Sequence, residues 1–285
     1  MKRLASLIVC CFVGPCLYCQ QTADFNVAII VDDESSISLQ LSDLKAEVDH
    51  QPVAVTSITP LAGKCLQYSL LNDASKSNRW PDGIKQQTDA ADQLLKQVVA
   101  GSSDVGSLIN FNDEVYIDAQ NLNNTQKLAS KLERRGSGGT VTYDAVYSSV
   151  QFLAKQSALP NCRKVVFLFG DGEDNTSHVS LSETTRLLER TGIPMFIIAP
   201  STTEKKKEGE NLRQLASLSG GRVYFLPRDT RHVTFDLLKR DLAQSFLLRM
   251  AGPLPESHEL LPVTITDVSN PRVRIIAPSH ITVSF

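Results

Sequence analysis

Residues 70–77 read Leu-Leu-Asn-Asp-Ala-Ser-Lys-Ser, and this stretch joins an apolar run to a polar turn. A run with strand-like alternation ends at Leu71, and Asp73 follows it closely. Ser75 and Ser77 come next at spacings of two, so three side-chain oxygens can face one point at a strand-to-helix turn. One carboxylate and two hydroxyls suit a hard divalent cation. The competing interpretation is an ordinary turn, because Asp and Ser favour turns through their own local hydrogen bonds.

Outward from this stretch, the chain alternates between strand-like and helix-like segments. This alternation predicts an α/β fold with a doubly wound, mostly parallel sheet and helices on both faces. The expected strands are 65–71, 105–111, 114–117 (an antiparallel edge), 165–169, 194–199 and 222–226. The expected helices are 81–100, 125–132, 143–156, 182–191, 212–218 and 235–247, and residues 203–210 are expected to form a charged, solvated loop.

Both flanks of this α/β segment have β character. Short alternating runs separated by turns fill residues 24–59, and proline-punctuated runs follow Met250. Because neither flank has enough strands to be stable alone, we expect them to pack together as a small all-β subdomain. The predicted organisation is a leader at 1–21, an N-terminal β segment at 22–62, the α/β domain at 63–249 and a β tail at 250–285.

The first 21 residues have the pattern of a cleaved export signal. Lys2 and Arg3 precede an apolar run that ends near Val13, which is too short for a comfortable membrane span. An uncleaved anchor is the alternative, and lipidation of one of the leader cysteines is also open. No other stretch is apolar enough to cross a bilayer, so the mature chain is expected to be exported to the periplasm, the cell surface or the medium.

Composition restricts the class of partner. The 285 residues are 42% hydrophobic and carry a formal net charge of −2, which is ordinary for a globular protein. A nucleic-acid-binding domain usually shows a basic surplus. We therefore expect no nucleic-acid partner.

Two of the expected strands lead into aspartates. Asp73 follows the first strand, and Asp171 follows the continuously apolar run that ends at Phe169. Ligands collect at the carboxyl ends of the strands in an open α/β sheet, so these carboxylates converge if the two strands are neighbours. Thr140 follows a glycine-rich turn and would reach the same rim. The candidate metal ligands are all oxygens: Asp73, Ser75, Ser77, Thr140 and Asp171.

These residues resemble a known motif. Asp73-Ala74-Ser75-Lys76-Ser77, Gly138-Gly139-Thr140 and the segment 169–175 are similar to the metal-ion-dependent adhesion site of the von Willebrand factor type A domain. The resemblance covers roughly residues 65–248 and fills all five ligand positions. The flanks resemble those of secreted von Willebrand factor A-related proteins of acidobacterial type.

The resemblance implies a cofactor and a kind of partner. The cofactor would be Mg²⁺, with Mn²⁺ or Ca²⁺ as alternatives, and the partner a protein that presents an Asp or Glu as the last ligand. Two residues depart from the family pattern without removing a ligand: Asn72 replaces an apolar or small residue, and Gly170 replaces a frequent Thr. The neighbouring Glu173 and Asp174 are expected to be solvated loop charges, and the alternative is that they accept hydrogen bonds around the site.

Two cysteines lie outside the leader. Cys65 precedes Asp73 by nearly the same number of residues as Cys162 precedes Asp171. If both aspartates meet one cation on parallel neighbouring strands, the cysteines lie at similar depth at the opposite end of the sheet. We expect a Cys65–Cys162 disulfide, which an exported location permits, with two buried free thiols as the alternative.

We expect a protein-binding module and no enzyme. The sequence has no phosphate-binding glycine loop and no nucleophile elbow. One alternative is a metal-dependent hydrolase, for which only Glu173, Asp174 or His178 could be the general base. The other is a structural envelope protein in which the metal only stabilises the rim.

Overall fold

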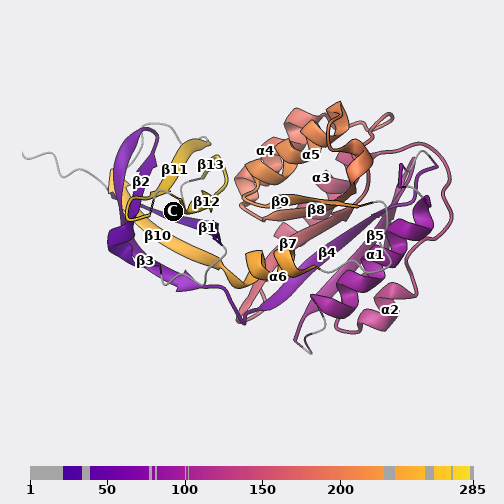
Figure 1. Cartoon of the computed structure of the whole chain (residues 1–285), viewed down its shortest axis with the longest axis horizontal. Coiled ribbons are helices and arrows are strands. Elements are labelled where there is room, and N and C mark those ends of the chain that lie inside the picture. Colours follow the sequence, from indigo (N-terminus) through magenta and orange to yellow (C-terminus); the bar gives the residue numbers. More distant parts are fainter. Residues whose placement is uncertain are drawn as a thin grey trace, which may run out of the picture.

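The structure is a computed structural model of the chain, and it describes residues 22–33, 39–76, 79–80, 82–99, 101, 103–227, 235–253, 260–270 and 272–282. The predicted leader at 1–21, the start of the first expected helix at Pro81 and the last three residues of the expected β tail lie outside these ranges. Two lobes are visible in Figure 1, an antiparallel sheet and a parallel sheet covered by helices. In the described part of the chain, no helix is both long and apolar enough to span a membrane.

The larger lobe, here called the α/β lobe, is built on a six-stranded sheet. All neighbouring strands run parallel except the edge strand β6, which pairs antiparallel with β5. This confirms the predicted doubly wound sheet and its antiparallel edge. The strands in spatial order are β6 (Val115–Leu122), β5 (Val105–Phe111), β4 (Cys65–Asp73), β7 (Cys162–Phe169), β8 (Met195–Pro200) and β9 (Arg222–Leu226).

Helices cover both faces of this sheet, as Figure 1 shows. One face of β4 presents Leu66, Tyr68 and Leu70 to the core beneath α1 (Ile84–Gln97), α2 (Thr125–Ala129) and α6 (Asp236–Ala243). The other face packs against α3 (Thr142–Lys155), α4 (Leu181–Thr191) and α5 (Lys207–Leu218). Alternation along β4 therefore separates two apolar cores, as the sequence pattern indicated.

The two flanks combine in one seven-stranded antiparallel sheet, the antiparallel lobe. Its own core includes Phe25, Val27 and Ile29 from the N-terminal flank and Leu248 and Met250 from the C-terminal flank. The strands in spatial order are β12 (Arg274–Ile276), β1 (Thr22–Asp32), β10 (Ser245–Pro253), β3 (Gln51–Pro60), β2 (Leu44–Val48), β11 (Leu261–Asp267) and β13 (His280–Ile281).

Two expectations for secondary structure were wrong. The expected helix 235–247 ends at Ala243, and Ser245 already begins β10, which pairs with both β1 and β3. Buried strand pairing on both sides decides this segment, because Leu248 and Met250 enter the antiparallel core. The expected loop 203–210 contains the start of α5 at Lys207, preceded by a short 3₁₀ turn, η2 (Ser201–Thr203). A second 3₁₀ turn, η1 (Leu41–Asp43), precedes β2.

The amino ends of β4 and β7 carry the disulfide. Cys65 and Cys162 are direct partners in the parallel register, and their Cα atoms are 4.4 Å apart. The two residues form a disulfide, which confirms the predicted pairing. It closes a segment of 97 residues.

Polar contacts join the two lobes near these amino ends. Arg222 of β9 pairs with Asp32 of β1 at 2.8 Å and with Asp241 of α6 at 3.1 Å. Glu189 of α4 lies 2.7 Å from His280 of β13. The antiparallel lobe therefore lies at the end of the sheet that is opposite to Asp73 and Asp171.

Candidate metal centre

Asp73 is the last residue of β4, and β7 is the parallel neighbour of that strand. The register pairs Asn72 with Phe169, so Asp171 leaves β7 next to Asp73. A Cβ placed on Gly170 would lie 3.2 Å from Asp73 Cβ and 3.3 Å from its Oδ2. The glycine at this position, where the family often has Thr, therefore leaves room for the Asp73 carboxylate.

The Asp73 carboxylate is fully buried and only half satisfied. Its Oδ1 accepts a hydrogen bond from the Ser75 backbone N–H at 2.9 Å. Neither Asp73 Oδ2 nor Ser75 Oγ has a hydrogen-bond partner among the described residues, although both atoms are buried. Buried polar atoms are rarely left without partners, so this pair of oxygens is a candidate for metal coordination.

The charge state of Asp73 reflects its surroundings. Burial, together with the repulsion from the nearby Asp171 carboxylate, raises the pKa of Asp73 from 3.8 to about 7. The hydrogen bond from the Ser75 backbone N–H opposes the rise in this pKa. Two carboxylates that repel each other in a buried site are stabilised together by a cation.

Asp171 is also buried, and both of its oxygens accept backbone hydrogen bonds. Its Oδ2 accepts from the Arg79 N–H at 2.8 Å, and its Oδ1 accepts from the Glu173 N–H at 3.0 Å. Burial raises the pKa of Asp171 above its ordinary value, while these two N–H groups oppose the rise. The bonds fix the carboxylate beside Asp73, and they leave each oxygen with further capacity to accept.

Thr140 is buried in the loop that precedes α3, against the loop that follows Asp171. Its N–H donates to Asn175 Oδ1 at 2.9 Å, and its carbonyl oxygen accepts from the N–H groups of Asn175 and Thr176. The loop that contains Thr140 also contacts the first site loop, because the Ser137 N–H donates to the Ala74 carbonyl at 2.9 Å.

The structure therefore brings three predicted ligands, Asp73, Ser75 and Asp171, into one buried cluster, and Thr140 lies in a loop bonded to the loops of both aspartates. Ser77, the fifth predicted ligand, lies outside the described residues.

Asn72, the other departure from the family pattern, belongs to a buried polar network. Its Nδ2 donates to Asn110 Oδ1 at 2.8 Å and to the Glu133 carbonyl at 3.1 Å. Gln87 Nε2 donates to Asn72 Oδ1 at 3.0 Å and to the Asp73 carbonyl at 2.7 Å. This network ties α1 and the loop after α2 to the end of β4, so an apolar residue at position 72 would leave polar groups without partners.

Several side chains near the site make contacts that no local pattern predicted. Asp174 is not a solvated charge, because its Oδ1 accepts from the Tyr143 N–H at 3.1 Å and from Ser177 Oγ at 2.5 Å. Arg79 pairs with Glu173 at 3.6 Å and with Glu208 of α5 at 3.1 Å. No local spacing indicated these contacts, since each joins elements that are distant in the sequence.

The residues present fit a hard divalent cation. The cluster offers carboxylate and hydroxyl oxygens, and the unpartnered Asp73 Oδ2 and Ser75 Oγ are the type of donor that Mg²⁺ prefers. Among the described residues, no group of three or more His, Cys, Asp or Glu side chains is placed to hold a metal ion. A site of this composition would therefore depend on hydroxyl groups and water as well as on the two carboxylates.

A family model described as the von Willebrand factor type A domain matches residues 70–239, which include Asp73, Ser75, Thr140 and Asp171. The chain belongs to the von Willebrand factor type A domain family. The match covers most of the α/β lobe and leaves out the strands of the antiparallel lobe. No curated protein matches the chain.

Several solved structures are similar to this von Willebrand factor type A chain. Proximal thread matrix protein 1 from the mussel byssus is 16% identical with a TM-score of 0.49, over 66% of this chain and 49% of that one. The PilB minor pilin from Streptococcus sanguinis is 13% identical with a TM-score of 0.44, over 57% of each chain. The conserved hypothetical protein BatB from Bacteroides thetaiotaomicron is 13% identical with a TM-score of 0.45, over 58% of this chain and 91% of that one. The chain therefore spans about half the length of the mussel protein.

Proposed function

We propose that this chain is an exported, divalent-cation-dependent protein-binding module. In this proposal Asp73, Ser75, Ser77, Thr140 and Asp171 hold Mg²⁺, Mn²⁺ or Ca²⁺ directly or through water, and an Asp or Glu of a protein partner completes the coordination. Family membership supports an interaction module of the adhesion type. The observation that carries the metal is the buried pair Asp73 Oδ2 and Ser75 Oγ, which has no partner among the described residues and lies beside a second carboxylate.

The chain's own residues prepare the site for such a ligand. The N–H groups of Ser75, Glu173 and Arg79 orient the two carboxylates, so little reorganisation is required on binding. A bound cation would supply the positive charge that attracts a partner's carboxylate. The backbone contacts among the three site loops hold Thr140 at the same rim.

The contacts of the candidate general bases disfavour the metal-dependent hydrolase. The ring of His178 is 92% exposed, and its Nδ1 lies 3.1 Å from Asp144. Glu173 pairs with Arg79, and Asp174 accepts from the first turn of α3. Each of the three side chains therefore already has a partner within the protein.

Export is supported by the disulfide. Disulfides form and persist in oxidising compartments and are rare in the cytosol. The Cys65–Cys162 bond is therefore consistent with the leader pattern at residues 1–21.

Isothermal titration with MgCl₂ and MnCl₂ tests the metal site. We expect binding of one cation per chain, a loss of about 100-fold or more in affinity for Asp73→Ala, and wild-type affinity for Asp24→Ala, an exposed aspartate of β1. Equal affinity of the Asp73→Ala variant and the wild type would refute the site.

Partner capture then tests the binding role. Envelope and surface proteins are passed over the immobilised chain in Mg²⁺ or in EDTA, with Asp73→Ala as the matched bait. A partner retained only by the wild type in Mg²⁺ supports adhesion through the metal. Cation binding that stabilises the fold but changes no capture would favour the purely structural role, and phosphoesterase activity that depends on Asp73 would favour the hydrolase.

A further inference from the structure

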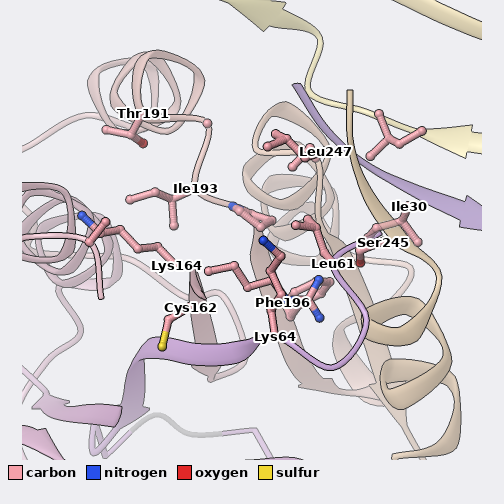
Figure 2. A pocket seen from close by; sticks show the side chains of 17 residues that line it. Ile30, Leu61, Lys64, Cys162, Lys164, Thr191, Ile193, Phe196, Ser245 and Leu247 are labelled. Carbon is pink, nitrogen blue, oxygen red and sulfur yellow. The ribbon is translucent and has the colours of Figure 1, made fainter. Parts of the chain in front are cut away.

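A second candidate site lies between the two lobes, at the opposite end of the sheet from Asp73. A half-open cleft of about 330 Å³ is enclosed by β1 and β10 of the antiparallel lobe and by β7, β8 and the turn before β8 of the α/β lobe. Figure 2 shows Leu61, Lys64, Ile193 and Phe196 around its centre. The volume is at the lower end of the range for small-molecule sites.

The walls of this interlobe cleft are apolar. Ile30 of β1, Leu247 of β10 and Ile193 before β8 contribute side chains, and Phe196 lies among them. Leu247 is 36% exposed, although it is a large apolar residue at the junction of two lobes. An apolar occupant would remove this surface from water, which is favourable in proportion to the area covered.

The charges of the cleft have one sign. Of the described residues, those that line it include three bases, Lys64, Arg163 and Lys164, and no Asp or Glu. The whole chain has a net charge of −2, so this concentration of bases is not a reflection of overall composition. A cleft lined by one sign of charge attracts ligands of the opposite sign.

The three bases differ in the hydrogen-bond partners that their side chains already have. Lys164 points away from the cleft and donates to the Gln156 carbonyl at 2.6 Å beyond the end of α3. Arg163 donates through Nη2 to the Leu242 carbonyl at 2.8 Å, and its Nε is buried without a hydrogen-bond partner among the described residues. The Asp104 carboxylate attracts the Arg163 guanidinium electrostatically, but Asp104 does not line the cleft. Its two oxygens accept hydrogen bonds from the N–H groups of Leu66 and Gly101.

Lys64 is the base whose charged group remains available to bind a ligand. Its backbone N–H donates to the Leu61 carbonyl, but its ammonium group has no hydrogen-bond or ion-pair partner in the described part of the chain. The residue is half-buried in the turn between β3 and β4, where both lobes meet. An ammonium group that lies beside apolar walls is best satisfied by an anionic oxygen.

We propose that the interlobe cleft binds a small apolar molecule that carries one carboxylate, with the apolar part against Ile30, Ile193 and Leu247 and the carboxylate on Lys64. Such a ligand contacts both lobes at once and would hold them in one relative orientation. The site is independent of the metal centre, because it uses other residues at the other end of the sheet.

The test is isothermal titration of the full chain with octanoate, octanol and octylammonium, all in EDTA. The chelator ensures that octanoate cannot bind through a cation at the metal centre. We expect one octanoate per chain and at least tenfold weaker binding of octylammonium, with octanol between them.

Three variants locate the binding. Lys64→Gln should lower the octanoate affinity about tenfold, while Lys127→Gln, the same change on an exposed part of α2, should have no effect. Ala28→Phe should abolish binding of all three probes, because Ala28 is paired with Leu247 in the strand register and lines the cleft. Thermal unfolding of each variant checks that it is folded.

Absence of octanoate binding would overturn the proposal. Equal affinity for octanoate and octylammonium, or an unchanged affinity in folded Lys64→Gln, would overturn it as well. Octanoate binding that persists in folded Ala28→Phe would place the ligand elsewhere and would also contradict it.

Discussion

At their amino ends, β4 and β7 are joined by the Cys65–Cys162 disulfide and lie against the antiparallel lobe, whereas at their carboxyl ends they release Asp73 and Asp171 into a buried polar cluster. The amino ends are held by the disulfide and by the antiparallel lobe. The carboxyl ends are held by backbone hydrogen bonds among loops, and they contain buried oxygens without partners among the described residues. The contrast shows that one pair of strands can be covalently constrained at its amino end and leave buried oxygens without partners at its carboxyl end.

Removing the disulfide should have the largest effect on stability. The double change Cys65→Ala and Cys162→Ala frees a segment of 97 residues in the unfolded chain, and the free energy of unfolding should fall by about 4 kcal/mol. Urea denaturation measures this loss. Affinity for Mg²⁺ should change less than about twofold at 25 °C, because the site loops lie at the other end of the strands. A large loss of metal affinity in the folded variant would show that the two ends are coupled.

The sign of the pH dependence of stability should reveal the protonation of Asp73 at the carboxyl end of β4. In the folded, cation-free chain the pKa of Asp73 is about 7, above its ordinary value of 3.8, so the unfolded chain releases this proton first. The contribution of Asp73 to stability is therefore present at low pH and is lost as the pH rises from about 4 to 7, by about 3 kcal/mol.

Urea denaturation in EDTA at pH 5 and pH 8 measures this change, and the difference between wild type and Asp73→Asn isolates it from other groups. The wild type should lose more stability than Asp73→Asn as the pH rises, while Asp24→Asn should behave as the wild type does. Mg²⁺ should restore most of the loss at pH 8. A steeper loss in Asp73→Asn than in the wild type would contradict the assignment.

Removing the side chain that holds the Thr140 backbone should have a smaller effect, on the affinity for Mg²⁺. Asn175→Ala removes the side-chain oxygen that accepts the Thr140 N–H at 2.9 Å, and Mg²⁺ affinity should fall about fivefold. Asn270→Ala is the matched control, since Asn270 accepts the Arg272 N–H in the antiparallel lobe. Titration calorimetry compares the two variants. Equal affinities would mean that the loop is held without Asn175.

Replacing the Arg79 side chain should have the smallest effect on stability and on Mg²⁺ affinity. Arg79→Met removes ion pairs with Glu173 and Glu208 whose side chains are 25% and 24% exposed, and such pairs contribute at most about 1 kcal/mol. The Arg79 N–H that holds Asp171 stays in place, so Mg²⁺ affinity should remain within about twofold of the wild-type value. A loss as large as that of Asp73→Ala would require a direct role for the guanidinium group.

Much of the α/β lobe could be predicted because its signals are local. Val105–Phe111 and Arg222–Leu226 have the bounds that the apolar runs indicated, and the nearly equal spacing of Cys65 and Cys162 from the two aspartates agrees with their direct pairing. The segment after Ala243 could not be predicted in the same way, because its helical pattern was overruled by pairing with β1 and β3. The residues just after Ala243 gave no signal of the distant strands on either side of them.

The sequence by itself determined the alternation of strands and helices, the placing of Asp73 and Ser75 on one turn, and the similar spacing of the two cysteines from the aspartates, because each depends on spacing along the chain. Only the tertiary structure decided that β4 and β7 are neighbours, that Asn72 joins Gln87 and Asn110 in a buried network, and that Lys64 faces a cleft between two lobes. These features depend on the order of strands in a sheet and on the packing of separate elements. Spacing along the chain constrains neither, so partners distant in the sequence become visible only when the chain is folded.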